Sequence, residues 1–167
     1  VFTTLPSNCT SREEVVYNAW QARHVLTAGV HGVLHTHTRD PEATRAFVSI
    51  CRYPFQTIGR DLALPEGRRG GGGQANAAKI WGLTPQEYVQ KADPWPLNPE
   101  GELMLGLKIE DRHCLAQANE IAATPGIAFA EWGPGDMGMS FGYPNAHDPP
   151  YPRLMETARQ TVKTACD

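Results

Sequence analysis

Apolar and polar positions along the chain alternate between strand-like and helix-like segments. Apolar runs predict strands at Val1–Leu5, Val30–His37, Leu103–Ile109 and Ile127–Ala130. The third run is almost continuously apolar, which is typical of a strand covered on both faces. Helical patterns or helix-start signals separate the strands, at residues 11–29, 40–51, 76–81, 85–92, 111–123 and 152–165. Strands that alternate with helices in this way predict a parallel sheet or barrel.

The predicted fold class is α/β, with this chain supplying about half of the units of a TIM-type (β/α) barrel. A complete barrel takes roughly 250 residues, whereas the chain has 167. We expect one domain over residues 1–167, interrupted by a long Gly/Pro-rich insertion at residues 59–99. Gly67–Gly73 contains too many glycines for a regular element. The insertion is therefore either a lid over a pocket or a mobile surface loop.

Composition and charge narrow the classes of function. The chain is 41% hydrophobic and 20% charged, with a net charge of −3, as expected of a globular domain. Arg68 and Arg69 form the only basic doublet, which is too little for nucleic-acid binding. No apolar run approaches the roughly 20 residues that cross a bilayer, so we expect a cytoplasmic protein without a membrane partner. The widely spaced cysteines favour free thiols.

Acidic residues follow two of the predicted strands. Glu110 comes directly after Leu103–Ile109, and Asp136 comes shortly after Ile127–Ala130. Because equivalent ends of parallel strands lie at one edge of the sheet, we expect the two carboxylates to converge. Oxygen ligands suit Mg²⁺ or Mn²⁺ better than zinc. The alternative is that both residues are surface acids that cap helices or form ion pairs.

A Gly-Pro-Gly turn at residues 133–135 precedes Asp136. Because Gly135 lacks Cβ, a ligand can approach the main chain closely, and the N–H groups there can bind a carboxylate. Such a site would hold both ends of a 2-keto acid. The keto oxygen and one carboxylate oxygen would contact the metal, and the backbone amides would take the remaining negative charge.

The strand around residue 35 carries three histidines at alternating positions. His31, His35 and His37 would project to one side of a regular strand. Residues two apart on one face rarely supply three tetrahedral ligands, so a zinc site is disfavoured. For His37 the alternative is a strand histidine with ordinary hydrogen-bond partners. His113 is expected to be a solvated helix residue.

Two blocks, Leu105–Gly142 and Glu42–Arg60, resemble the HpcH/HpaI class II (metal-dependent) 2-keto acid aldolases, a family that includes macrophomate synthase. The specific combination is a strand ending in Ile-Glu, a helix, Pro-Gly-Ile and then Gly-Pro-Gly-Asp-Met. The resemblance implies a barrel in which Glu110 and Asp136 bind a divalent metal. We expect Mg²⁺, with Mn²⁺ or Co²⁺ as alternatives. It also implies that the amides of Gly135 and Asp136 bind the carboxylate of pyruvate.

The resemblance further implies an aldehyde-lyase that cleaves or forms 2-keto acid aldols through a metal-stabilised pyruvate enolate. His37 and Tyr88 match pocket residues of the family and are the predicted catalytic side chains. The family's general base lies upstream of the matched region, and its substrate-binding arginine falls on or near Leu5, which carries no charge. Either another cation binds the substrate or the substrate differs.

Three readings of function stay open at this point. The first is a metal-dependent aldolase acting on a small 2-keto acid. The second is an oxaloacetate decarboxylase or a macrophomate synthase-like enzyme that uses the same enolate. The third is a half-barrel binding module that kept the fold and lost the chemistry. In each case fold-level analogy predicts a homo-oligomer.

Overall fold

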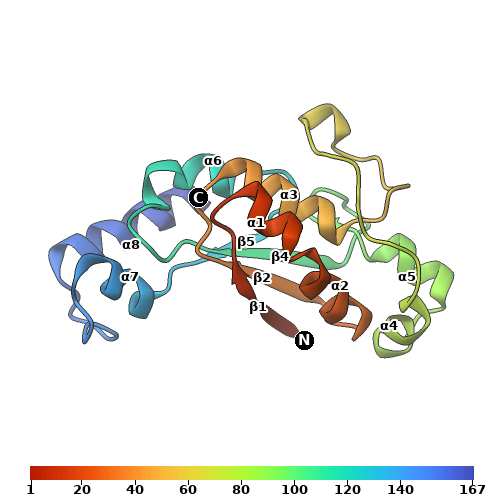
Figure 1. Cartoon of the computed structure of the whole chain (residues 1–167), viewed down its shortest axis with the longest axis horizontal. Helices are drawn as coiled ribbons and strands as arrows, with labels where there is room; N and C mark the ends of the chain where they lie inside the picture. Colours follow the sequence, from red (N-terminus) through yellow and green to blue (C-terminus); the bar gives the residue numbers. More distant parts are fainter.

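The five strands all run parallel in one sheet, and the helices pack mainly on one face of it (Figure 1). This computed structural model describes every residue from Val1 to Asp167. The strands are β1 (Phe2–Asn8), β2 (Gly32–Thr36), β3 (Pro94–Trp95), β4 (Leu103–Lys108) and β5 (Phe129–Glu131). Their order is β1-β2-β4-β3, and β5 also pairs with β4. A parallel sheet of βα units confirms the predicted fold class.

The helices connect successive strands and cover the sheet. They are α1 (Arg12–Tyr17), α2 (Ala19–Thr27), α3 (Pro41–Cys51), α4 (Gln74–Trp81), α5 (Pro85–Lys91), α6 (Ala118–Ala122), α7 (Pro134–Phe141) and α8 (Arg153–Cys166), with short 3-10 helices η1 (Arg60–Leu62) and η2 (Leu115–Gln117). Asp40 caps α3 by accepting a hydrogen bond from the N–H of Glu42, and Pro41 occupies its first turn. None of the helices combines the length and apolar character that a membrane crossing requires.

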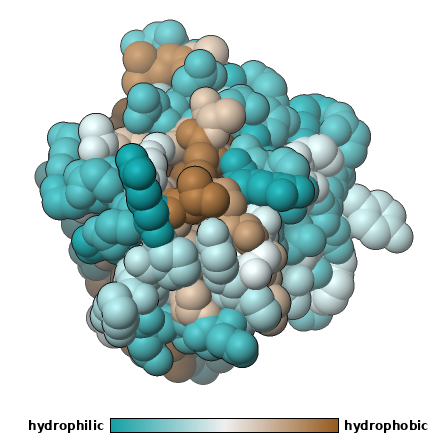
Figure 2. Space-filling model, turned by 90° about the vertical axis from the view of Figure 1, so that its left-hand side faces the viewer, coloured by the Kyte–Doolittle hydropathy of each residue, from teal (hydrophilic) through white to brown (hydrophobic).

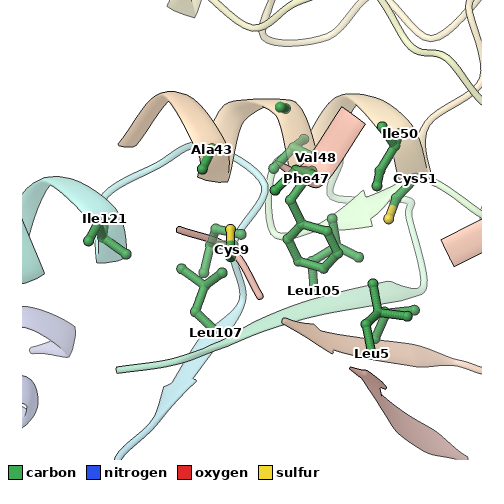
Figure 3. Packing of buried hydrophobic residues seen from close by; sticks show 14 of the residues in the cluster. Leu5, Cys9, Ala43, Phe47, Val48, Ile50, Cys51, Leu105, Leu107 and Ile121 are labelled. Atoms are coloured by element: carbon green, nitrogen blue, oxygen red, sulfur yellow. The ribbon is translucent and has the colours of Figure 1, made fainter. Parts of the chain in front are cut away.

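The main core lies between β4 and the helix layer. Leu103, Leu105, Leu107 and Ile109 alternate along β4 and its end, and all four are fully buried. Figure 3 shows Leu105 and Leu107 pointing toward the helix layer, with Phe47 of α3 lying over Leu105. Residues between these leucines must therefore face the opposite side of the sheet. That alternation places Lys108 and Glu110 together on the opposite face.

Several predicted elements differ in the structure. The helix expected over residues 11–29 is two helices, α1 and α2, that meet at Asn18. The helix expected over residues 111–123 is wrong, because only η2 and the five-residue α6 form there. Strand β1 continues through Pro6 to Asn8, which is possible because β1 pairs only with β2 and forms an edge of the sheet. The helix α7, which was not predicted, begins within the Gly-Pro-Gly turn.

The glycine-rich loop lies away from the carboxyl ends of the strands. The backbone N–H groups of Arg68 and Arg69 donate to the carbonyls of Ser49 and Arg52, where α3 ends. Since α3 runs antiparallel to the strands, its last turn lies beside their amino ends. Residues 74–81 and 85–91 of the insertion are helical. In this structure Arg68 and Arg69 therefore do not lie over the carboxyl ends of the strands, and the role of the insertion as a lid stays a prediction.

Candidate metal centre

Glu110 follows β4 directly and is almost completely buried, with 1% of its surface exposed. Its Oε1 accepts a hydrogen bond of 3.2 Å from the backbone N–H of His37. Its Oε2 is buried without a hydrogen-bond partner, and the Lys108 Nζ lies 3.5 Å away. Burial raises the pKa of Glu110 above its usual value, although Lys108 and His37 act in the opposite direction. A buried oxygen without a partner is a free position for a cation.

Asp136 lies in the first turn of α7, which begins directly after β5. The first backbone hydrogen bond of this turn joins the Met137 N–H to the Gly133 carbonyl over 3.0 Å. The N–H groups of Gly135 and Asp136 therefore have no partner within the helix, and the positive end of its dipole lies here. A Cβ at Gly133 would lie 2.7 Å from Oε2 of Glu110. Glycine at this position is what lets the turn approach the carboxylate.

His37 completes a cluster with the two acids. Strand β2 ends at Thr36, and His37 has a φ of 47°, in the left-handed region that side chains other than glycine rarely adopt. One ligand atom from each of His37, Glu110 and Asp136 can be chosen so that all lie within 4.8 Å of one another. The predicted convergence of the two carboxylates is thus present in the structure, and the histidine joins them.

Asp111 and Arg39 surround His37, and no pattern in the sequence singles out either of them. The Asp111 Oδ2 lies 3.2 Å from the His37 Nδ1 and accepts a hydrogen bond of 2.9 Å from the Arg39 Nε. Burial favours a raised pKa for Asp111, but hydrogen bonds from Arg39 and the His113 backbone outweigh it and lower the pKa. Asp111 is therefore a carboxylate at neutral pH.

An open hollow of about 410 Å³ extends from this cluster to the start of α7. Its lining residues are His37, Arg39, Asp111, Arg112, His113, Asp136, Met139 and Ser140. His113 was expected in a solvated helix, yet it lies in a turn and lines the hollow. Figure 2 shows the side of the molecule on which α7 and α8 lie, which is mostly hydrophilic around a central hydrophobic patch.

Two residues singled out from the sequence lie elsewhere. Tyr88 is fully buried on α5, where its hydroxyl accepts from the Arg69 Nη2 over 2.6 Å and its ring packs on Trp81. Trp81 in turn stacks on His31, just before the first residue of β2, so Tyr88 lies at the amino ends of the strands. Leu5 is buried in the main core and brings no charge to the hollow. We therefore leave Tyr88 out of the proposed site.

The three alternating histidines do not share one environment. His35 is buried with its ring against Phe47, and burial lowers its pKa to about 4. His31 stacks on Trp81 at the other end of the strand. His37 leaves the strand through its positive φ and meets the carboxylates instead. The expectation that the three rings project to one side fails because the strand ends before the last of them.

Comparison with known proteins agrees with this architecture. The model of the HpcH/HpaI aldolase/citrate lyase family matches residues 12–167. The chain belongs to this family. Similar curated proteins include the hydroxypyruvate/pyruvate aldolase of Sagittula stellata, which is 29% identical over 82% of this chain and 46% of the relative. The pyruvate aldolase of Rhizobium etli is 28% identical over 84% of this chain and 47% of its own length.

Solved structures of the family share the fold. An HpcH/HpaI aldolase/citrate lyase family protein from Burkholderia cenocepacia matches with a TM-score of 0.72 and 24% identity, over 98% of this chain and 53% of that one. Macrophomate synthase matches with a TM-score of 0.59 and 23% identity, over 99% and 49%. The chain spans about half the length of the relatives it matches, and its sheet is about half of a (β/α) barrel.

Proposed function

We propose that this chain carries the metal-binding half of a divalent-metal-dependent carbon–carbon lyase that acts on 2-keto acids. The observation that carries the proposal is the meeting of Glu110 and Asp136 at the carboxyl ends of β4 and β5. Active sites of (β/α) barrels lie at this end of the strands. The names of the curated relatives, hydroxypyruvate/pyruvate aldolase and pyruvate aldolase, support the same class of reaction.

The residues present fit a divalent cation. The carboxylates of Glu110 and Asp136 would hold it, and the buried Oε2 of Glu110 has no hydrogen bond that the ion would have to break. A divalent ion bound there would supply a Lewis acid for the negative charge that develops on a 2-keto acid substrate. The oxygen ligands are compatible with Mg²⁺, Mn²⁺ or Co²⁺.

The chain's own groups would hold the substrate in this proposal. The partner-free N–H groups of Gly135 and Asp136 suit a carboxylate, because they lie at the start of an eight-residue helix. Lys108 comes two residues before Glu110, so both side chains lie on the same face of the sheet. The Nζ of Lys108 lies 3.7 Å from the Oε1 of Glu131. We assign to Lys108 the positive charge that Leu5 does not provide. We also keep the expectation of a cytoplasmic homo-oligomer without nucleic-acid or membrane partners.

Calorimetric titration of pyruvate tests this function. We expect pyruvate to bind with Mg²⁺ or Mn²⁺ present and not after chelation, since the ion is part of the binding site. Asp136→Asn should weaken metal binding at least 10-fold and abolish the metal-dependent pyruvate signal. Asp148→Asn is the control, because Asp148 is an exposed acid outside the cluster. Pyruvate binding that is equal with and without metal would contradict the proposal.

A further inference from the structure

The chain turns sharply at His37, directly after strand β2. A regular strand would send His37 to the same face as His35, whose ring packs against Phe47 of α3. The φ of 47° turns the chain instead, and the His37 N–H then donates to Glu110. A positive φ at a residue with Cβ carries strain, which the surrounding contacts must hold in place. Here the strained turn brings the imidazole to the carboxylates.

The protonation of the ring follows from its neighbour. The His37 Nδ1 lies 3.2 Å from the Asp111 Oδ2. The other oxygen of Asp111, Oδ1, accepts from the backbone N–H groups of His113 and Cys114 over 2.8 and 3.2 Å. An ionised carboxylate only accepts hydrogen bonds, so the proton of the neutral ring lies on Nδ1. The lone pair is then on Nε2, which lies 4.0 Å from the Oε1 of Glu110.

We infer that the Nε2 of His37 is a third protein ligand of the metal centre, and that the centre therefore prefers a first-row transition ion over Mg²⁺. This inference rests on the proposed function for the existence of the centre and adds a ligand to it. Histidines that bind metals commonly donate their other ring nitrogen to a carboxylate, as His37 does to Asp111. Imidazole nitrogen suits transition ions, whereas Mg²⁺ prefers oxygen.

A second observation points to a ligand at this place. Glu110 is 1% exposed, and its Oε2 has no hydrogen-bond partner. In an octahedral site with bonds of about 2.1 Å, neighbouring ligand atoms lie about 3 Å apart. The chosen ligand atoms of His37, Glu110 and Asp136 lie within 4.8 Å of one another, so the side chains of the partly buried His37 and the exposed Asp136 would have to move closer when an ion binds. The turn of the backbone at His37 brings its side chain to the two carboxylates.

Pulsed electron paramagnetic resonance of bound Mn²⁺ is the direct test. We expect the spectrum to contain the ¹⁴N coupling of a directly coordinated imidazole, and His37→Gln to remove it. Calorimetry should give a Co²⁺ affinity at least 100-fold lower in His37→Gln, with the Mg²⁺ affinity changed less than about 3-fold. Asp111→Asn should lower Co²⁺ affinity about 10- to 100-fold, because the ring loses the partner that orients it.

The matched control is His24→Gln, since His24 is an exposed histidine on α2 outside the cluster. It should leave the spectrum and both affinities unchanged. Mn²⁺ bound by the unaltered protein without ¹⁴N coupling would overturn this inference and leave the carboxylate centre of the proposed function intact. Failure of the unaltered protein to bind Mn²⁺, Co²⁺ or Mg²⁺ would overturn both. The spectrum of the unaltered protein decides the question even if His37→Gln does not fold.

Discussion

A carboxylate is buried at each end of the sheet, and the two carboxylates differ in how many hydrogen bonds they accept. At the amino ends, Asp93 accepts two hydrogen bonds from Arg52, of 2.6 and 2.9 Å, and a third from Asn98. At the carboxyl ends, Glu110 accepts one backbone hydrogen bond, and its Oε2 has no hydrogen-bond partner, with the Nζ of Lys108 3.5 Å away. The first arrangement stabilises the fold, whereas the second keeps a coordination position free. The amino ends of the strands therefore contribute to stability, whereas the carboxyl ends carry the proposed site.

The largest expected effect comes from making the same isosteric change at both carboxylates. Asp93→Asn should lower the free energy of unfolding by about 3 to 5 kcal/mol, because it leaves the buried Arg52 without a counter-charge. Glu110→Gln should change the free energy of unfolding by less than about 1 kcal/mol. The buried charge of Glu110 has few compensating contacts, so its removal costs the folded state little. Urea denaturation at neutral pH measures both values. Equal losses would mean that Glu110 is also a structural residue, and the contrast would fail.

A smaller effect is expected where α7 approaches Glu110. Gly133 has φ −92° and ψ 104°, which alanine also adopts, so Gly133→Ala introduces no backbone strain. Its Cβ would lie 2.7 Å from the Oε2 of Glu110 and would displace the carboxylate. We expect about a 10-fold loss of Mn²⁺ affinity, or about 1.4 kcal/mol.

Gly142→Ala is a comparison for this substitution, because a Cβ at Gly142 meets nothing within 4 Å. Its φ of 82° means that it will lower stability, yet its metal affinity should stay unchanged. Calorimetric titration of Mn²⁺ into both variants separates the two effects. Unchanged Mn²⁺ affinity in Gly133→Ala would show that the close approach has no role in metal binding.

The smallest effect concerns His35, which lies between the two ends. Its pKa is lowered to about 4 by burial, against about 6.5 in an unfolded chain. Between these values the unfolded chain binds more protons, so stability is complete above about pH 6.5 and falls as the pH drops. From about pH 7.5 to 5.5 we expect His35 to account for a loss of about 1 kcal/mol.

The measurement is the free energy of unfolding at both pH values, for the unaltered protein and for His35→Leu. The variant lacks the titrating group, so its stability should fall less between the two values. Glu110 acts with the opposite sign, because a raised carboxyl pKa favours the folded state as the pH drops. An identical pH dependence in both proteins would mean that His35 does not titrate as its burial requires.

The strands other than the two-residue β3, and the two acids that follow them, could be predicted from apolar runs in the sequence. The run of β4 is the clearest, because this strand is buried on both faces. Leu103–Ile109 is apolar except for Lys108, so the strand end and Glu110 follow from it. The start of α7 was missed because Gly-Pro-Gly was interpreted as a turn. Proline in the first turn of a helix is favourable, and that signal was present at Pro134.

Other parts of the site depend on contacts between distant residues, which no local sequence pattern indicates. The positive φ of His37 is held by Glu110, a residue far away in the chain. Asp111 could be seen next to Glu110, but nothing in the sequence indicates that it faces the ring of His37. Tyr88 was assigned by a gapped resemblance. Its place at the other end of the sheet depends on how Arg69 and Trp81 pack around it.

The three residues of the cluster follow three different strands, β2, β4 and β5. An ion held by all three would be a cross-link between βα units that are distant along the chain. Fraying of any one strand end would then have to break a bond to the ion, so the ends would open together rather than separately. Amide hydrogen exchange at these strand ends should become uniformly slow when the ion binds.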